Sequence, residues 1–348
     1  MRVTILGAGG FVGSHLVEHL GPRHRVLGLD VTDEKLRDVD ADFEFREVDI
    51  RHDEQALEEA IRTADVVIDL VAYANPSLYV ETPLEVFELN FTQNLKVAEL
   101  CAAHRRWLVQ YSSAEVYGKA RDGTRFREDE TDFVLGPVTR HRWIYPAAKA
   151  LLERVLHAHG LEGSLDYTII RPFNFIGSRI DYLVPPGSMG GPRVFAHFMS
   201  ALLGGGPMYV VDGGHVHRAF LHIEDANRAL ETILERREAS RNQIFNVGNP
   251  DNDLVIRDLA ALMRELYVEL TGQPSSSPIV EVSGEEFYGA GYEDADRLPP
   301  DITKLRRLGW APRHGIRETF RHAMAYYLEN PPAGIGVDRV REPTAATA

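Results

Sequence analysis

Tyr145 and Lys149 are the two residues whose types and spacing point most directly to chemistry. They stand four residues apart in RWIYPAAKALLERVL, a stretch that predicts a helix, so both side chains project from the same face. The pKa of a tyrosine is ordinarily about 10, and its hydroxyl acts as a base near neutral pH only where positive charge stabilises the phenolate. Lys149 and the cationic ring of a nicotinamide cofactor would supply that charge.

A glycine-rich turn near the start of the chain predicts the site for such a cofactor. Gly7, Gly10 and Gly13 in GAGGFVG follow a short β-branched strand and open a predicted helix. Glycines at these positions let the backbone approach a pyrophosphate, which rests on the amino-terminal end of the helix. The second strand ends at Asp30, whose carboxylate can bind the adenosine ribose and would repel a 2′-phosphate. The predicted cofactor is therefore NAD rather than NADP.

Other cofactor contacts are expected at the ends of the neighbouring strands. Asp49 and Ile50 follow a third predicted strand, where they could flank the adenine. The residues expected to contact the cofactor are Gly7, Gly10, Phe11, Val12, Gly13, Asp30, Asp49, Ile50, Leu70, Ala72, Tyr145 and Lys149.

Alternating strands and helices must position these residues. Short apolar runs predict strands at 3–6, 25–29, 66–71, 108–111 and 167–170. Amphipathic stretches predict helices at 11–20, 54–62, 84–104 and 147–159. This alternation is typical of a parallel sheet covered on both faces, which predicts an α/β, Rossmann-like doubly wound fold.

The pattern changes at about residue 177, where PPGSMGGP and GGGP predict long loops around a smaller α/β lobe. We expect an NAD-binding domain over residues 1–175, with a return segment at about 215–250, and a mainly substrate-binding lobe over 176–328. The tail at 331–348 contains few large apolar residues and is predicted to be disordered.

Composition narrows the classes of partner. The 348 residues carry 38 Lys and Arg against 52 Asp and Glu, a net charge of −14, which argues against binding to nucleic acid or to an anionic membrane. An anionic ligand must then be held by a local basic cluster. The single cysteine, Cys101, excludes an intrachain disulfide, and the apolar start lacks the features of a signal peptide. A cytoplasmic location is expected.

The fourteen histidines raise the question of a metal site. His15 and His19 lie four residues apart on the first helix, and His215, His217 and His222 cluster later in the chain. No third ligand lies at a convincing spacing near the first pair, whose helix is expected to pack on the cofactor side, so we expect structural or exposed histidines and no metal.

Several longer strings carry a family resemblance. GAGGFVG, YSSAEVYG at 111–118, Tyr145 with Lys149, and RPFN at 171–174 resemble the extended short-chain dehydrogenase/reductase family that acts on nucleotide sugars. RPFNFIGSRID at 171–181, VDGGHVHRAF at 211–220, FNVGNPDN at 245–252 and EFYGAGYEDADR at 286–297 resemble two of its groups, the UDP-glucuronate decarboxylases and the UDP-apiose/UDP-xylose synthases. The resemblance spans residues 1–328.

The resemblance implies oxidation of UDP-glucuronic acid at C4, loss of carbon dioxide, and formation of UDP-4-keto-pentose or UDP-xylose. Tyr145 and Lys149 would act in the oxidation, and Ser113 would orient the 4-oxygen. Glu115 matches the acid/base near C5, and Arg297 matches an arginine that approaches the sugar carboxylate. Residue 114 is alanine, where these groups have serine or cysteine, so any step that needs that side chain is in doubt.

A larger set is expected to bind the sugar nucleotide. Five arginines are the candidate cations for its negative charges, and other residues match substrate contacts of the family. Besides Arg297, the expected substrate-binding residues are Ala74, Tyr79, Arg142, Asn174, Arg179, Arg193, Tyr209, Arg218 and Tyr292.

Other functions stay open from the sequence. A UDP-apiose/UDP-xylose synthase is the strongest alternative, although both positions where that group carries cysteines, 74 and 114, are alanine here. A UDP-glucuronate 4-epimerase is possible if the substrate carboxylate is oriented unfavourably for its loss. The hypothesis of a 4,6-dehydratase is weakened because residue 114 is alanine. From a different class of function, a non-catalytic NAD-sensing regulator is the alternative. The resemblance also implies a homodimer through helices 84–104 and 147–159.

Overall fold

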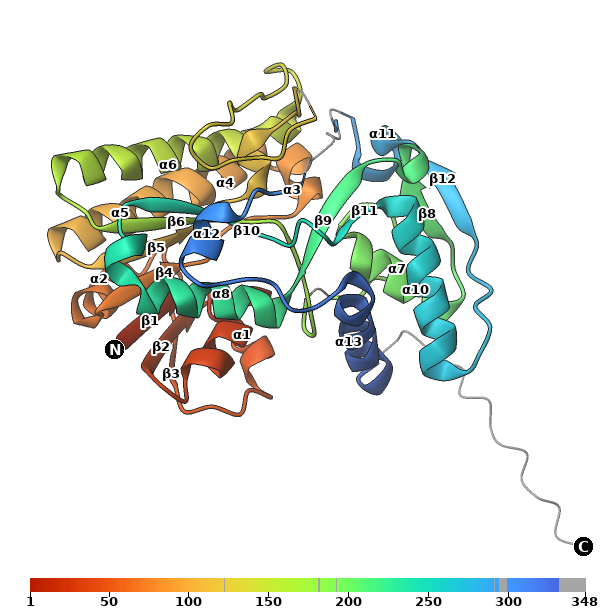
Figure 1. The fold of residues 1–348 in the computed structure, drawn as a ribbon, viewed down its shortest axis with the longest axis horizontal. Coiled ribbons are helices and arrows are strands. Elements are labelled where there is room, and N and C mark those ends of the chain that lie inside the picture. Colours follow the sequence, from red (N-terminus) through yellow and green to blue (C-terminus); the bar gives the residue numbers. More distant parts are fainter. Residues whose placement is uncertain (122, 181, 192, 291, 294–298, 332–348) are drawn as a thin grey trace, which may run out of the picture.

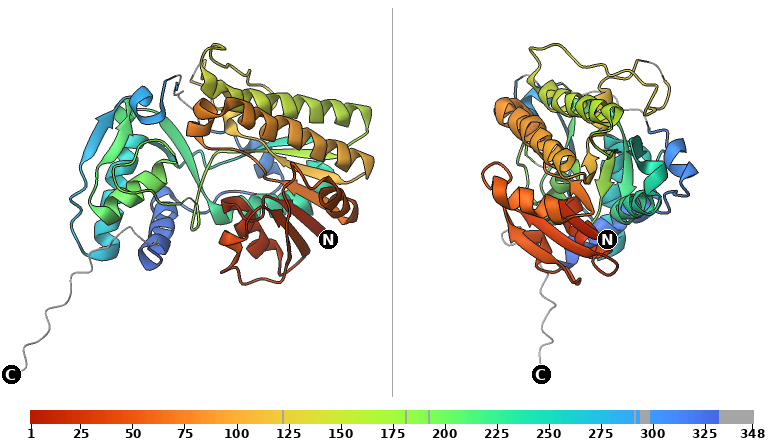
Figure 2. Two further views of the ribbon diagram at one scale, coloured as in Figure 1. Left: turned by 180° about the vertical axis from the view of Figure 1, so that it is seen from behind. Right: turned by 90° about the vertical axis from the view of Figure 1, so that its left-hand side faces the viewer.

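The computed structural model describes residues 1–348 apart from 122, 181, 192, 291, 294–298 and 332–348. The predicted disordered tail therefore lies, from residue 332 onward, outside the described residues. Two lobes stand side by side, the larger built on a parallel sheet and the smaller on short sheets and helices (Figures 1 and 2).

Seven parallel strands form the sheet of the larger lobe, in the order β10-β6-β5-β4-β1-β2-β3. Their bounds are β1 (Arg2–Leu6), β2 (Arg25–Asp30), β3 (Glu44–Glu47), β4 (Val66–Asp69), β5 (Trp107–Tyr111), β6 (Tyr167–Pro172) and β10 (Gln243–Val247). The chain winds outward from β1 in one direction and from β4 in the other, so the strand order reverses between these two neighbours. In such sheets, ligands bind at the carboxyl ends of the strands beside this reversal.

Helices cover both faces of the sheet, which confirms the predicted α/β doubly wound class. The helices α1 (Phe11–Leu20) and α8 (Ile223–Glu235) lie on one face, and α2 (Glu54–Thr63), α5 (Asn94–Ala103) and α6 (Ile144–Glu162) lie on the other (Figure 1). Successive strand residues point to opposite faces. Val66 and Ile68 thus pack with α1 and α8, whereas Val67 packs with α2, α5 and α6.

The helix predicted over 84–104 is three consecutive segments. They are α4 (Pro83–Phe87), a π-helical turn over Glu88–Gln93 and α5. The Asn90 side chain in the turn donates to the carbonyls of Val86 and Tyr73, at 2.9 and 3.1 Å, and Asn94 at the start of α5 donates to the Val71 carbonyl at 3.1 Å. These bonds fasten the loop that follows β4.

The smaller lobe has two sheets. One contains β7 (Asn174–Ile176), β9 (His217–His222) and β11 (Asp253–Val255), and the other pairs β8 (Met208–Val211) with β12 (Ile279–Val282). Its helices include α7 (Val194–Gly204), α10 (Ile256–Thr271), α11 (Gly284–Tyr288) and α13 (Ile316–Glu329). The remaining helices are α3 (Pro76–Glu81), α9 (Arg237–Ser240) and α12 (Thr303–Arg307), with short 3₁₀ turns at 34–36, 114–117, 141–143 and 212–214.

The segment after β9 returns to the larger lobe. Helix α8 packs against α1, and β10 pairs with β6 at the edge of the large sheet. Among the described residues, no helix is long and apolar enough to cross a membrane.

Candidate active site

Two cavities meet at the carboxyl ends of the strands. The first, here called the glycine-side cavity, is lined by Gly7, Gly10, Phe11, Val12, Gly13, Leu70, Ala72, Tyr79, Ser113 and Tyr145, among others. The second, the arginine-side cavity, is lined mainly by the smaller lobe and includes Arg142, Arg218, Tyr209 and Tyr292. Ala74, Glu115, Asn174 and Arg193 line both cavities.

The turn between β1 and α1 fits a pyrophosphate. Gly7 has a φ of +82°, and a Cβ on Gly13 would lie 2.1 Å from the Gly7 carbonyl oxygen, so glycine is required at both positions. Gly10 caps α1 without a side-chain hydrogen bond. The first backbone N–H groups of the helix are thus available to an anion in the glycine-side cavity.

Asp30 is anchored to the same turn. Its carboxylate accepts hydrogen bonds from the backbone N–H of Gly9 at 2.9 Å and of Val31 at 2.7 Å, while burial raises its pKa. Asp49 is held differently, because its hydrogen bonds to Arg51 lower its pKa to about 2. Ile50 is buried. None of these three residues is among those lining the glycine-side cavity.

Helix α6 presents Tyr145, Lys149 and Glu153 at intervals of four residues along one buried face. Tyr145 borders the glycine-side cavity and stacks on Tyr79 of α3, with ring centroids 4.6 Å apart and planes within 5°. Lys149 is 1% exposed, and its Nζ donates to the Tyr111 carbonyl at 3.1 Å. Burial lowers the pKa of Lys149 to about 8, while the carboxylates of Asp69 and Glu153 act in the opposite direction.

Ser113 and Glu115 follow β5, in the 3₁₀ turn that begins at the sheet edge. The Ser113 hydroxyl oxygen accepts a hydrogen bond from the Glu115 N–H at 3.1 Å, so its own proton can be donated elsewhere. Glu115 forms an ion pair with Arg142, whose Nη2 lies 3.2 Å from Oε2. Arg142 is 2% exposed and packs against the ring of Trp143, at 4.9 Å from the centroid. A buried arginine therefore holds the Glu115 carboxylate where the two cavities meet.

A second buried ion pair, between Arg171 and Glu153, lies next to this region. Arg171 donates to both carboxylate oxygens of Glu153, at 3.0 and 2.6 Å, and to the Tyr117 hydroxyl at 2.7 Å. Ser112, beside Ser113, donates to Glu153. Glu153 and Arg171 were not predicted from the sequence, although Glu153 continues the four-residue spacing of Tyr145 and Lys149 and Arg171 opens RPFN.

The expected substrate-binding residues are divided by the structure. Ala74, Asn174, Arg193, Tyr209, Arg218, Tyr292 and Arg142 all line the arginine-side cavity, and Tyr79 lines the glycine-side cavity. Asn174 donates to the Ala219 carbonyl at 3.0 Å. Arg297 lies outside the described residues.

Arg179 is not brought into either cavity, which corrects its expected placement. It has a φ of +58°, and its guanidinium pairs with Glu18 and contacts His15 on α1. Its side chain is thus used to join the loop after β7 to the first helix. Conversely, the arginine-side cavity is also lined by two aromatic residues that were not predicted from the sequence, Phe287 and Tyr288 of α11. They could have been selected from the sequence because they lie in EFYGAGYEDADR, one of the strings that carry the family resemblance.

The fold and the paired tyrosine and lysine define a class, that of enzymes built on a dinucleotide-binding sheet whose site joins a cofactor cavity to a cationic ligand cavity. A family model, "NAD dependent epimerase/dehydratase family", matches residues 3–248. The chain belongs to this family, and its cofactor is NAD.

Similar proteins cover nearly the whole chain. The UDP-D-apiose/UDP-D-xylose synthase 1 of Arabidopsis thaliana is 38% identical over 94% of this chain and 91% of its own length. The corresponding synthase of Oryza sativa subsp. japonica is 37% identical, over 94% and 89%. Among solved structures, the PbgP3 protein from Burkholderia pseudomallei matches with a TM-score of 0.83 and 34% identity, over 94% of this chain and 96% of that chain.

Proposed function

We propose that the protein is an NAD-dependent UDP-glucuronic acid decarboxylase that forms UDP-4-keto-xylose, UDP-xylose or both. The observation that carries the proposal is the buried Arg142–Glu115 ion pair, which lies at the junction between the tyrosine-lysine site and a cavity with further arginines. The two synthases cited above carry UDP-D-xylose in their names, which supports the same substrate class.

The chain's own residues fit the cofactor. The glycine turn leaves room that a Cβ at Gly13 would fill, the start of α1 offers backbone N–H groups, and Asp30 stands at the end of β2 for the ribose. When bound, NAD supplies the acceptor for the hydride that leaves C4 of the sugar.

Tyr145, Lys149 and Ser113 would carry the oxidation. Tyr145 removes the proton of the sugar 4-hydroxyl, and the positive charge of Lys149 on the same helix face stabilises the phenolate that this requires. The Ser113 proton is donated to the 4-oxygen and orients it. The product of this step is a 4-ketone, which makes the C5 carboxylate that of a β-keto acid.

Decarboxylation then needs a held carboxylate and a proton source. Carbon dioxide leaves C5, the bonding electrons move into the C4 carbonyl, and a proton returns to C5. Glu115 is placed to deliver or accept that proton, and Arg142 keeps its carboxylate oriented. Two other arginines that line the cavity, Arg193 and Arg218, would face the UDP phosphates and the sugar carboxylate. By resemblance, Arg297 would add a further contact.

UDP-apiose/UDP-xylose synthesis is the second candidate, and the 38% identity to the Arabidopsis enzyme favours it. Two features of the cavity act against it. Ala74 and Ala114 line the glycine-side cavity at the positions where that group carries cysteines. A methyl group can neither donate nor accept a proton, so the ring contraction lacks two groups that could assist it.

The test is to incubate the purified protein with UDP-glucuronic acid and NAD, follow NADH absorbance, and identify products by NMR and mass spectrometry. A carboxyl-free ketosugar with NADH, or UDP-xylose without net NADH, supports the decarboxylase. A branched pentose would replace it by the apiose synthase, and UDP-galacturonic acid by the 4-epimerase. Absence of turnover in protein that binds NAD contradicts the proposal. In the Glu115→Gln variant, decarboxylation should slow more than oxidation, and equal loss of both would remove the role given to Glu115.

We further propose the homodimer expected from the helices at 84–104 and 147–159. Leu84 on α4 is 81% exposed, and Leu151 and Leu161 on α6 are 46% and 77% exposed. A second copy of the chain would cover these side chains. The mass in solution, measured by light scattering, tests this, and a monomer at micromolar concentration would contradict it.

A further inference from the structure

Three histidines that are far apart in the sequence form a cluster between the lobes. His222 ends β9, His314 lies in the loop before α13, and His322 lies on α13. One ligand nitrogen from each lies within 4.8 Å of the others. We call these three residues the histidine cluster. The cluster could not be predicted from sequence spacing, because 91 residues separate His222 from His314.

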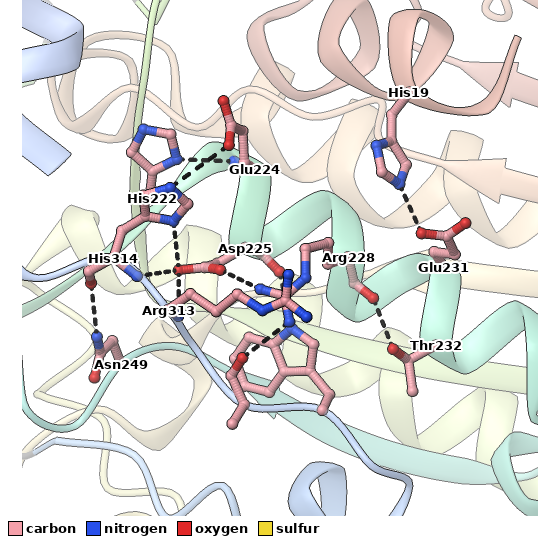
Figure 3. Close-up of polar contacts among 12 residues, drawn as sticks. His19, His222, Glu224, Asp225, Arg228, Glu231, Thr232, Asn249, Arg313 and His314 are labelled. Carbon is pink, nitrogen blue, oxygen red and sulfur yellow. Dashed lines mark hydrogen bonds and ion pairs between the residues drawn. The ribbon is translucent and has the colours of Figure 1, made fainter. Parts of the chain in front are cut away.

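His314 is held in a defined orientation by buried Asp225 on α8. The Asp225 Oδ2 lies 3.0 Å from His314 Nδ1 and also accepts the backbone N–H groups of Arg313 and His314, at 2.9 and 3.0 Å (Figure 3). Arg228 donates to the other oxygen of Asp225 at 2.5 Å. Because Nδ1 is engaged, the Nε2 of His314 is the nitrogen available to a ligand, and it lies 3.5 Å from Glu224 Oε2.

This arrangement has the form of a built metal site. Histidines that bind metals usually give their second ring nitrogen to a carboxylate, which orients the ring and makes the ligating nitrogen more basic. The Asn249 and Asn252 amides also donate to the His314 carbonyl, at 3.2 and 3.1 Å, so the loop before α13 is fixed on both sides of the ring.

His222 and His322 complete the cluster. The Nε2 of His222 lies 3.1 Å from the Nδ1 of His322, and the ring of His222 stacks on that of His314 with centroids 4.0 Å apart. The three rings thus bring one nitrogen each into a single small volume.

We propose that His222, His314 and His322 form a binding site for a divalent transition metal ion of the zinc type, with Glu224, beside His314, placed to supply the fourth ligand. Ligand bonds of about 2.0–2.1 Å in tetrahedral geometry place neighbouring donor atoms about 3.4 Å apart. The distances of 3.1 Å between His222 and His322, and 3.5 Å between His314 and Glu224, are close to this value. Three imidazoles and one carboxylate are a donor set that suits Zn²⁺.

The ion can reach the cluster from outside. His222, Glu224 and His322 line a cavity that also includes His15, Glu18 and Glu329. Glu224 and His322 are exposed residues whose side chains can adjust to the ion. His19 is turned away from the cluster and pairs with Glu231 at 3.0 Å (Figure 3).

Binding of the metal ion would move the ring proton of His222 from one nitrogen to the other. The Nδ1 of His222 now accepts the backbone N–H of Glu224 at 3.2 Å, which leaves the ring proton on Nε2. When Nε2 binds the ion, that proton moves to Nδ1, and the long hydrogen bond at the start of α8 is given up. The ring of His222 must also turn out of parallel with that of His314, whose orientation Asp225 keeps.

The position of the cluster gives the ion a structural role. It would join α13 to the start of α8, which packs on α1 beside the glycine turn, and to β9, which carries Arg218 at its other end. Metal binding should thus stabilise the junction of the two lobes without entering either cavity of the active site.

The experiment uses the full chain after removal of metals with a chelator. Co²⁺ and Zn²⁺ are titrated in turn, with visible absorption and calorimetry as readouts, and thermal unfolding is recorded with and without Zn²⁺. We expect one equivalent of Co²⁺ to give the intense absorption of a tetrahedral site, Zn²⁺ to displace it, and Zn²⁺ to raise the unfolding temperature.

Two variants and one control locate the site. His322→Ala removes an exposed ligand with little risk to folding and should weaken Zn²⁺ binding by about a hundredfold. Glu224→Gln should weaken Zn²⁺ binding by about tenfold. His159→Ala, at the far end of α6, should bind as the unaltered chain does. Absence of stoichiometric binding by the unaltered chain, or equal affinity in His322→Ala and His159→Ala, overturns the proposal.

Discussion

The two cavities that meet at Glu115 are built in different ways. The glycine-side cavity takes its shape from backbone and small residues, such as Gly7, Gly13 and Ala72, with one buried cation, Lys149, beneath it. The arginine-side cavity takes its character from long side chains, among them Arg193 and Arg218, that come from separate segments of the smaller lobe. Substitutions in the glycine-side cavity should therefore strongly reduce cofactor binding or catalysis. Substitutions in the arginine-side cavity should weaken substrate binding by smaller amounts.

The largest expected effect is that of Tyr145→Phe on the glycine side. Loss of the hydroxyl removes the base, and we expect hydride transfer to fall about 10²- to 10⁴-fold while NAD still binds. Single-turnover NADH formation and NAD titration measure the two quantities. Tyr326→Phe on α13 is the control and should keep its activity. A Tyr145→Phe variant with near-normal turnover would show that another group removes the proton.

Gly13→Ala should come next. The added Cβ would meet the Gly7 carbonyl oxygen at 2.1 Å and the Ala8 Cα at 2.7 Å, and both are backbone atoms that cannot move aside cheaply. We expect a loss of about 3 kcal/mol in the free energy of unfolding, with weakened NAD binding. Urea unfolding measures the first, and Gly123→Ala, where no atom lies within 4 Å of the new Cβ, is the control. Equal stability of the two variants would contradict the close packing of the turn.

Arg218→Ala tests the other side and should have a smaller effect. Removal of one charged hydrogen-bond donor from the cavity should raise the KM for the sugar nucleotide about tenfold, with little change in kcat. The matched change Arg179→Ala should leave KM unchanged, because that arginine pairs with Glu18 outside the cavity. Steady-state kinetics distinguish the two. A larger rise in KM for Arg179→Ala than for Arg218→Ala would contradict the placement of Arg218 inside the cavity and of Arg179 outside it.

Lys149 should give the most gradual effect, a change of stability spread over a range of pH. Burial holds its pKa at about 8 in the folded protein, against about 10.4 in the unfolded chain, so between these values the unfolded state binds more protons. Its contribution therefore makes stability rise with pH across this window, by at most about 1.4 kcal/mol per pH unit. Urea unfolding of the cofactor-free protein and of Lys149→Met at a series of pH values measures the difference. A slope of the opposite sign would mean that Lys149 gains, rather than loses, affinity for its proton on folding.

Most strands and helices of the larger lobe could be predicted, because hydrophobic periodicity acts over short stretches of chain and the glycine turn between β1 and α1 is a recognisable motif. The edge strand β10 was not predicted, since it pairs with β6 only after the chain has passed through part of the smaller lobe. The helix over 84–104 was predicted as continuous, whereas the structure has a π-helical turn at Asn90. The reason is tertiary, since Asn90 turns back to the Tyr73 carbonyl of the loop after β4.

The substrate side could be predicted only in part, because residue type does not decide where a side chain is used. Arg142 and Arg179 were both candidate cations from the sequence, yet one is buried against Glu115 and the other is paired with Glu18. Phe287 and Tyr288 were not selected, because α11 reaches the cavity only through the packing of the smaller lobe.

By itself, then, the amino-acid sequence determined the alternation of strands and helices, the glycine turn and the four-residue spacing of Tyr145 and Lys149. These depend on the conformational freedom of glycine, on hydrophobic periodicity and on the pitch of one helix, all of which act over short stretches of chain. The tertiary structure alone decided which arginines face a common cavity, that Glu153 meets Arg171, and that His222, His314 and His322 come together. Such contacts join residues separated by up to a hundred positions, and only the packing of the whole core brings them within reach of one another.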